Sequence, residues 1–268
     1  MSVRWGVVLP GGSAAEQFEQ AVLAERHGWD GVFVWEAAYG VDAWTLLGAI
    51  ASATSRIALG TMLTPLPWRR PWKVASQAVT LDQLSGGRAI LTVGLGALGT
   101  GLPETGEPVS VTERAQRLDD GIDLMRALWA GESHFHGRHY RYDCNRDDLS
   151  SLGRPVRDTI PLWVVGAWPR PKSMRRVLRC DGVVPEWHLG RPGTPDDVRA
   201  VRAWLTEHDA NPDIVIDGES HTDQDATLVR TWADAGCTWW LESRWQMPHH
   251  SAERMAQIRR RIMMGPLI

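Results

Sequence analysis

Three short segments of the chain carry side chains that could move a proton or bind an anion, and each follows an apolar run. Trp35-Glu36 ends the first, where a buried carboxyl of raised pKa could orient a substrate or transfer a proton, or could form a salt bridge at the rim. The segment GAWPRPKSMRR, residues 166–176, opens a helix and is rich in cations, which suits either an anion site or a basic surface turn. Trp187-His188 follows the third run.

A glycine-rich segment, Gly94 to Gly99, fits the pattern GxGxxG. A dinucleotide site of the Rossmann type needs a helix to begin at once, so that the pyrophosphate meets the helix N-terminus. Here Thr100 to Pro103 follow, and they will not continue a helix. We therefore predict a loop in which the backbone at Gly94 and Gly96 closely approaches a ligand.

Histidine and cysteine residues give no indication of a metal site. His134, His136 and His139 form HxHxxH in a polar stretch, with no carboxylate or cysteine at a helpful spacing, so exposed surface is the favoured interpretation over a metal site. The three cysteines are widely spaced and odd in number, which is typical of the reduced thiols of a cytosolic protein: Cys144, Cys180 and Cys237.

The elements that position these residues are clearest between residues 56 and 96. Ile57–Leu63 and Ala89–Leu95 have the length and β-branched composition of strands. Between them, Pro71 can open a helix at its first position, and Gly86 supplies a stop. Strand, helix and strand in this order predict a right-handed βαβ unit with parallel strands.

The same alternation of strand and helix continues along the whole chain. Its density predicts a parallel sheet, and the count of eight favours one closed (β/α)8 TIM barrel over residues 1–268, with an open doubly wound sheet as the alternative. Ser13, Asp42, Thr112, Thr194 and Ser251 are predicted helix caps, and residues 137–160 a polar surface excursion. The predicted strands are Val3–Leu9, Val32–Trp35, Ile57–Leu63, Ala89–Leu95, Ile160–Val165, Val183–Val184, Ile214–Ile216 and Cys237–Leu241.

Composition agrees with a globular enzyme and argues against other classes. Of 268 residues, 43% are hydrophobic, which allows a large core, and a net charge of −3 argues against a nucleic-acid partner. No apolar run approaches the roughly 18 residues of a membrane span, and no N-terminal signal segment is apparent, so we expect a cytoplasmic protein without a membrane partner. Of the 15 Trp residues, we expect some to fill the core and others to line a pocket for a flat ligand.

The segment LGTMLTPLPWRRPWKVASQAVTLDQLSGGRAILTVGLG resembles the third-strand to fourth-strand region of the bacterial luciferase-like monooxygenases. AERHGWDGVFVWE, ERAQRLDDGIDLMRALWAGE and GCTWWLESRW are similar to further parts of that family. The resemblance implies a barrel enzyme that binds a flavin or a deazaflavin.

The resemblance also implies which residues form the site. It implies a non-proline cis peptide among Thr61, Met62 and Leu63, with Met62–Leu63 favoured, and a flavin phosphate at the turn after the fifth strand. For the phosphate we predict contacts with Gly166, Ala167, Trp168, Arg170, Lys172, Ser173 and Arg176. For catalysis we predict Trp35, Glu36 and His188, although Ala37 stands where the family often has a histidine.

The resulting functional prediction is an oxidoreductase that uses reduced FMN and dioxygen to oxygenate a small organic substrate, with a separate flavin reductase and a homodimer as expected partners. The alternatives are hydride transfer with the deazaflavin F420, or a non-catalytic ligand-binding barrel. FMN is placed ahead because it needs only one phosphate pocket. F420 has an acidic tail that would need a basic exit groove, which Arg69, Arg70 and Lys73 could line unless they are simply exposed.

Overall fold

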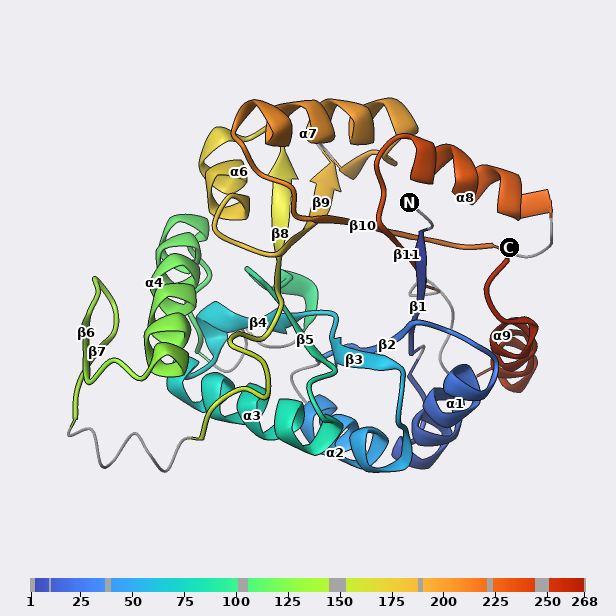
Figure 1. Ribbon diagram of the computed structural model, residues 1–268, viewed down its shortest axis with the longest axis horizontal. Helices are drawn as coiled ribbons and strands as arrows, with labels where there is room; N and C mark the ends of the chain where they lie inside the picture. The colour runs from blue at the N-terminus through green and yellow to red at the C-terminus, as the bar shows by residue number, and fades with distance from the viewer. Residues whose placement is uncertain are drawn as a thin grey trace.

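Eight parallel strands form a closed ring at the centre of the part of the chain that the structure describes (Figure 1). The computed structural model describes residues 3–9, 11–36, 40–100, 106–144, 153–187, 190–220, 224–243 and 251–267. Around the ring lie β1 (Arg4–Val8), β2 (Gly31–Val34), β3 (Ala58–Thr61), β5 (Ala89–Gly94), β8 (Leu162–Trp168), β9 (Gly182–Trp187), β10 (Asp213–Gly218) and β11 (Trp239–Glu242). The pairing of β3 with β5 closes the ring, which confirms the predicted (β/α)8 barrel.

Helices follow the strands in sequence and surround the ring (Figure 1). They are α1 (Ala14–Arg26), α2 (Ala43–Ala53), α3 (Pro71–Ser85), α4 (Val111–Ala130), α6 (Pro171–Val177), α7 (Pro195–Glu207), α8 (Gln224–Asp234) and α9 (Ala252–Met264). Among the described residues, no helix combines the length and the apolar character needed to cross a membrane.

Local sequence signals set most helix ends as predicted. The side chains of four predicted caps accept a backbone N–H of the first turn: Ser13, Asp42, Thr194 and Ser251. Pro71 is the first residue of α3, and Gly86 ends that helix with a φ of 68°. The prediction for α4 was wrong by two residues, because Ser110 rather than Thr112 accepts the N–H of Glu113.

The third strand is interrupted where the family resemblance implied a special peptide. β3 ends at Thr61, and the chain pairs with β5 again at β4 (Thr64–Pro65). The Met62–Leu63 peptide bond between them is cis, as predicted, and Trp168–Pro169 is a second cis bond. The surface excursion is less irregular than expected, because β6 (His134–His136) and β7 (Arg141–Asp143) form an antiparallel hairpin whose short, exposed strands give little hydrophobic signal.

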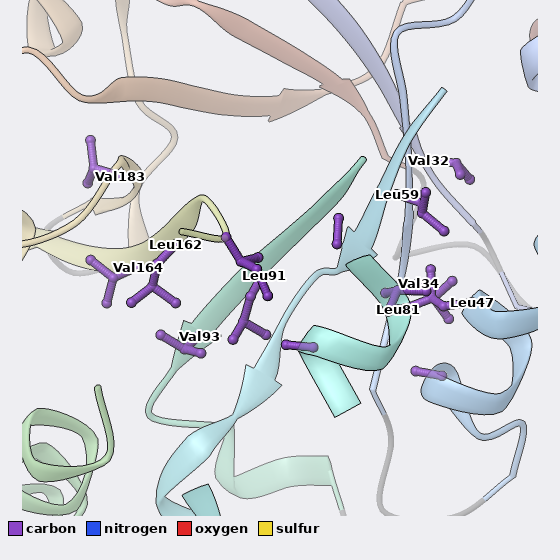
Figure 2. Close-up of a cluster of buried hydrophobic side chains, with 14 of the residues drawn as sticks. Val32, Val34, Leu47, Leu59, Leu81, Leu91, Val93, Leu162, Val164 and Val183 are labelled. Atoms are coloured by element: carbon purple, nitrogen blue, oxygen red, sulfur yellow. The ribbon is translucent and has the colours of Figure 1, made fainter. Parts of the chain in front are cut away.

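The core has two layers because successive side chains of each strand point to opposite faces. Val32 and Val34 belong to the larger layer between strands and helices, shown in part in Figure 2. Phe33, between them, belongs to a smaller layer inside the ring. There it packs on Trp163 and Trp239, whose ring centroids lie 5.3 Å apart at 67°. These indoles confirm that part of the unusual Trp content fills the core.

Candidate active site

A cavity of about 260 Å³ opens at the carboxyl ends of the barrel strands. One side is lined by residues at the ends of β2 to β4: Trp35, Glu36, Met62, Leu63 and Pro65. The other side is lined by residues of β9 to β11: Val184, Val215, Asp217 and Leu241. Trp68, Gly96 and Ala97 complete the lining. Barrel enzymes place their active sites at this end of the ring.

The cavity is mostly apolar, and its floor is the core inside the ring. Met62, Val215 and Leu241 belong both to that core and to the lining. Trp35 is 40% exposed, whereas Trp68 is buried and its indole N–H donates to the carbonyl of Pro108 at 2.8 Å. Two flat indoles and a floor of aliphatic side chains suit a flat aromatic ligand. The predicted Thr61 is buried beneath this lining and donates to the carbonyl of Thr92.

Among the described lining residues two carry carboxyl groups, and the first, Glu36, is held firmly by its neighbours. Thr64 Oγ1 donates to its Oε2 at 2.6 Å, Trp44 Nε1 donates to the same oxygen at 3.2 Å, and Arg69 forms an ion pair with Oε1. Burial raises the pKa of Glu36, and these three contacts oppose the rise without cancelling it. Arg69 also donates to Gln77 at 3.0 Å, so it is a structural partner and not the open rim residue considered for an acidic tail.

Asp217 is the second carboxyl group of the described lining, and it is not among the predicted site residues. The Asp217 side chain is exposed in the cavity. The surrounding protein raises the pKa of this carboxyl, although a hydrogen bond from the residue's own backbone N–H acts in the opposite direction. Within the described residues, no other side chain forms an ion pair with it. An acid that follows an isoleucine-rich strand at the carboxyl end of a barrel was the signal that could have found it.

The loop after β5 reaches the cavity, which Gly96 and Ala97 line, and its glycines also lie close to other side chains of the protein. A Cβ on Gly96, whose φ is +80°, would lie 2.2 Å from the ring of Trp68. One on Gly94 would lie 2.9 Å from Leu63. These glycines therefore make room for the protein's own side chains. The described residues 106–110 precede the next α-helix, which begins only at Val111, so the Rossmann alternative does not hold.

Arg114 of α4 fixes this loop and was missed in the sequence analysis. Its side chain is buried, and Nη1 donates to the carbonyl of Gly96 at 2.7 Å and to that of Leu95 at 3.3 Å. Its guanidinium also lies over the ring of Trp68, 5.3 Å from the centroid. An arginine in the first turns of a polar helix resembles a solvated residue, so no specific sequence signal predicts this role.

The predicted phosphate segment forms a closed turn beside the cavity. Ala167 donates its N–H to Ser173 Oγ at 2.9 Å, and Arg170 donates its N–H to the carbonyl of Ala167 at 2.8 Å. Arg170 and Lys172 are exposed, and Trp168 is half-buried. The turn adjoins the lining through β9, because Val165 pairs with Val184.

Two residues of this segment that were predicted to contact the phosphate, Gly166 and Arg176, are buried in the protein. A Cβ on Gly166 would lie 2.7 Å from Val183 and 2.9 Å from Val177, so this glycine allows β8 to pack closely against α6. Arg176 is buried and binds Asp119 of α4 with two bonds, of 2.7 Å and 3.0 Å, which separates it from Arg170 and Lys172. His188 and Ala37 lie outside the described residues.

The described histidines and cysteines form no group that suggests a metal site. His136 binds Asp143 across the exposed hairpin at 2.7 Å, and the described residues include no cluster of three or more His, Cys, Asp or Glu able to hold a metal ion. The three cysteines are free, as expected. The cavity, with Glu36 and Asp217, is therefore the candidate active site.

Comparison with known proteins gives the family. Residues 3–264 match the luciferase-like monooxygenase family model, and the chain belongs to this family. It is 34% identical, over 78% of its length and 59% of the other's, to a Mycobacterium tuberculosis protein assigned to the coenzyme F420-dependent oxidoreductases. It is 32% identical, over 59% of its length and 50% of the other's, to the F420-dependent glucose-6-phosphate dehydrogenase of Nakamurella multipartita. The chain thus spans about half to three fifths of these relatives.

A solved structure supports the fold independently. An F420-dependent secondary alcohol dehydrogenase, in complex with an F420–acetone adduct, superposes with a TM-score of 0.73. The match covers 90% of this chain and 93% of that one at 18% sequence identity. At this identity the likeness concerns the barrel alone.

Proposed function

We propose that this protein is an F420-dependent oxidoreductase that transfers a hydride between the deazaflavin and a small organic substrate. The observation that carries the proposal is the 34% identity, over 78% of this chain, to a protein assigned to the F420-dependent oxidoreductases. The demands of the two cofactors on the sequence favour FMN over F420, whereas the relatives favour F420.

The cavity fits the ring system of such a cofactor. Pockets that hold a whole drug-sized ligand measure roughly 300–1,000 Å³. A cavity of about 260 Å³, lined by Met62, Leu63 and Trp68 and by Val184 opposite, would take the flat ring and leave the phosphate-bearing chain outside. When bound, the deazaflavin would supply the group that accepts or donates the hydride.

The chain's own residues would bind, orient and exclude water. Trp35, at the mouth, would cover the ring, while Arg69 keeps Glu36 fixed beneath the rim. Arg170 and Lys172 are the exposed cations of the turn after β8, and we propose that they hold the cofactor phosphate. Ser173 accepts the Ala167 N–H, so its own hydroxyl proton could be donated to the same phosphate.

An FMN-dependent monooxygenase is the second candidate, and the family model's description as luciferase-like monooxygenase favours it. It would use dioxygen and would need a separate source of reduced flavin, for which the proposed partner is a reductase. F420 has the longer, more acidic tail, so its binding should weaken more with salt than binding of FMN.

Side-by-side titration of the purified protein with F420 and FMN, in low and moderate salt, tests the choice of cofactor. We expect F420 to bind, with an affinity that falls as salt rises, and FMN to bind weakly or not at all. Tight FMN binding without F420 binding would favour the monooxygenase. If neither cofactor binds or shifts the melting temperature, the result supports the non-catalytic barrel.

The phosphate assignment has its own test. Charge-assisted hydrogen bonds are worth roughly 1.5–3 kcal/mol each, so the double substitution Arg170→Glu/Lys172→Glu should weaken F420 binding at least about tenfold. Arg175→Glu, on the same helix and also exposed, is the matched control and should change the affinity by less than about twofold. An unchanged Kd in the double variant would contradict the assignment.

A further inference from the structure

We propose that Asp217 determines which substrates enter: the cavity accepts an uncharged molecule that donates a hydroxyl hydrogen bond to this carboxylate, and it rejects phosphorylated molecules. This inference rests on the proposed function, since it takes the cavity as the place where the substrate meets the cofactor. It names a substrate class unlike that of the glucose-6-phosphate dehydrogenases among the relatives.

The register of β10 directs Asp217 into the barrel. Ile214 and Ile216 belong to the core between strands and helices, whereas Val215 belongs to the core inside the ring. Side chains alternate along a strand, so Asp217 follows Val215 on the inner face. Its neighbour in register, Leu241 of β11, lines the same cavity. Asp217 therefore lies one inner-facing position above the cavity floor.

The two carboxyl groups of the cavity differ in what they can offer a ligand. Both oxygens of Glu36 already accept hydrogen bonds, from Thr64 and Trp44 on one and from Arg69 on the other. Asp217 is exposed in the cavity and can accept a hydrogen bond from a bound hydroxyl.

The charge around Asp217 is unfavourable for an anion. None of the described cavity-lining residues is basic, and the nearby Arg69 is bound to Glu36 and Gln77. Of the other acids on β10 and β11, Asp213 forms an ion pair with Arg4 and Glu242 lies 3.7 Å from Arg261, and neither is in the lining, so on these strands the charge that faces the cavity is that of Asp217. A phosphate group in this cavity would lose water and meet the like charge of Asp217, and no basic residue of the described lining would compensate for it. A hydroxyl group would instead form a charge-assisted hydrogen bond.

The experiment uses F420-loaded protein and two matched pairs of probes: glycerol with glycerol 3-phosphate, and glucose with glucose 6-phosphate. Binding of F420 by wild type, Asp217→Asn and Asp217→Lys is measured first, which tests the proposed function by itself. Probe binding is then followed by tryptophan fluorescence and by the melting temperature, and hydride transfer by the absorbance of the cofactor. If F420 does not bind, the probe binding measurements are made on the cofactor-free protein.

We expect wild type to bind at least one neutral probe at least tenfold more tightly than its phosphate ester. Asp217→Asn should weaken the neutral probe about tenfold, since a hydrogen bond to a charged group is lost. Asp217→Lys should reverse the preference toward the ester. Glu186→Lys, at the end of β9 but outside the cavity lining, is the matched control and should leave the preference in place.

Two results would overturn the inference. One is wild type binding a phosphate ester as tightly as its neutral partner. The other is wild type and both Asp217 variants treating all four probes alike, including by binding none of them. Because F420 binding is measured separately, either result can be told apart from a failure of the proposed cofactor.

Discussion

On the side of the cavity built by β2 to β5, the polar side chains hold one another, whereas on the side built by β9 to β11 the carboxyl of Asp217 is open to the cavity. Glu36 is fixed by Arg69, Thr64 and Trp44. Loss of hydration by the surrounding protein raises the pKa of both Glu36 and Asp217, but of the two only Glu36 has a guanidinium that opposes the rise. The two carboxyl groups therefore share the direction of their pKa shift but differ in their contacts: three side chains bind Glu36, whereas Asp217 is open to the cavity.

Removal of Arg69 should produce the largest effect, because it leaves a buried carboxylate without its cation. We expect Arg69→Leu to lower the free energy of unfolding by about 3 kcal/mol at neutral pH. The pKa of Glu36, already raised, should rise further, since Arg69 now opposes the effect of burial. The loss should shrink as pH falls and Glu36 becomes protonated. Urea unfolding at several pH values measures it.

Two variants isolate the ion pair. Arg70→Leu removes the neighbouring exposed arginine, which lies 5.8 Å from the ring of Trp72, and should change stability by less than about 0.5 kcal/mol. Glu36→Gln/Arg69→Leu removes both charges and should recover much of the loss. Equal losses in Arg69→Leu at acidic and neutral pH would contradict the role given to Glu36.

A substitution in the loop after β5 probes the same side of the cavity as Arg69→Leu, and its expected effect on stability is smaller. Gly96→Ala places a Cβ 2.2 Å from the ring of Trp68, at a φ of +80°, so we expect a loss of about 1–3 kcal/mol and weaker F420 binding. Gly99→Ala is the matched control, because nothing lies within 4 Å of its Cβ. Thermal unfolding and an F420 titration measure both variants. Similar losses in Gly96→Ala and Gly99→Ala would mean that the stiffness of the loop explains the effect, and not the contact between position 96 and the ring of Trp68.

Most of the fold was predictable because its signals are local. Strand runs, glycine stops and capping residues act within a few positions, and the order of eight strand–helix units then defines the barrel. The site was less predictable because its contacts are long-range. Glu36 meets Thr64 and Arg69, which are 28 and 33 residues away, and Arg176 meets Asp119, 57 residues away. Spacing therefore located the cavity end of the barrel, whereas the partners that hold Glu36 are apparent only in the structure.

Asp217→Asn should have the smallest effect on stability. The sign of this effect distinguishes the side of the cavity built by β9 to β11, where Asp217 lies, from the side built by β2 to β5. The folded protein raises the pKa of Asp217, so stability is fully present below the ordinary pKa of an aspartate and is lost as pH rises through the folded-state pKa. An asparagine cannot ionise, so the variant does not lose this stability as pH rises. Because Asp217 is exposed in the cavity, the gain at neutral pH should stay below about 0.5 kcal/mol and disappear in acid. Glu186→Gln, at the end of β9 and outside the cavity lining, is the control. Urea unfolding of the three proteins from acid to neutral pH measures the difference. A loss of stability in Asp217→Asn, comparable to that in Arg69→Leu, would mean that Asp217 is a structural carboxyl like Glu36 and that the two sides of the cavity do not differ.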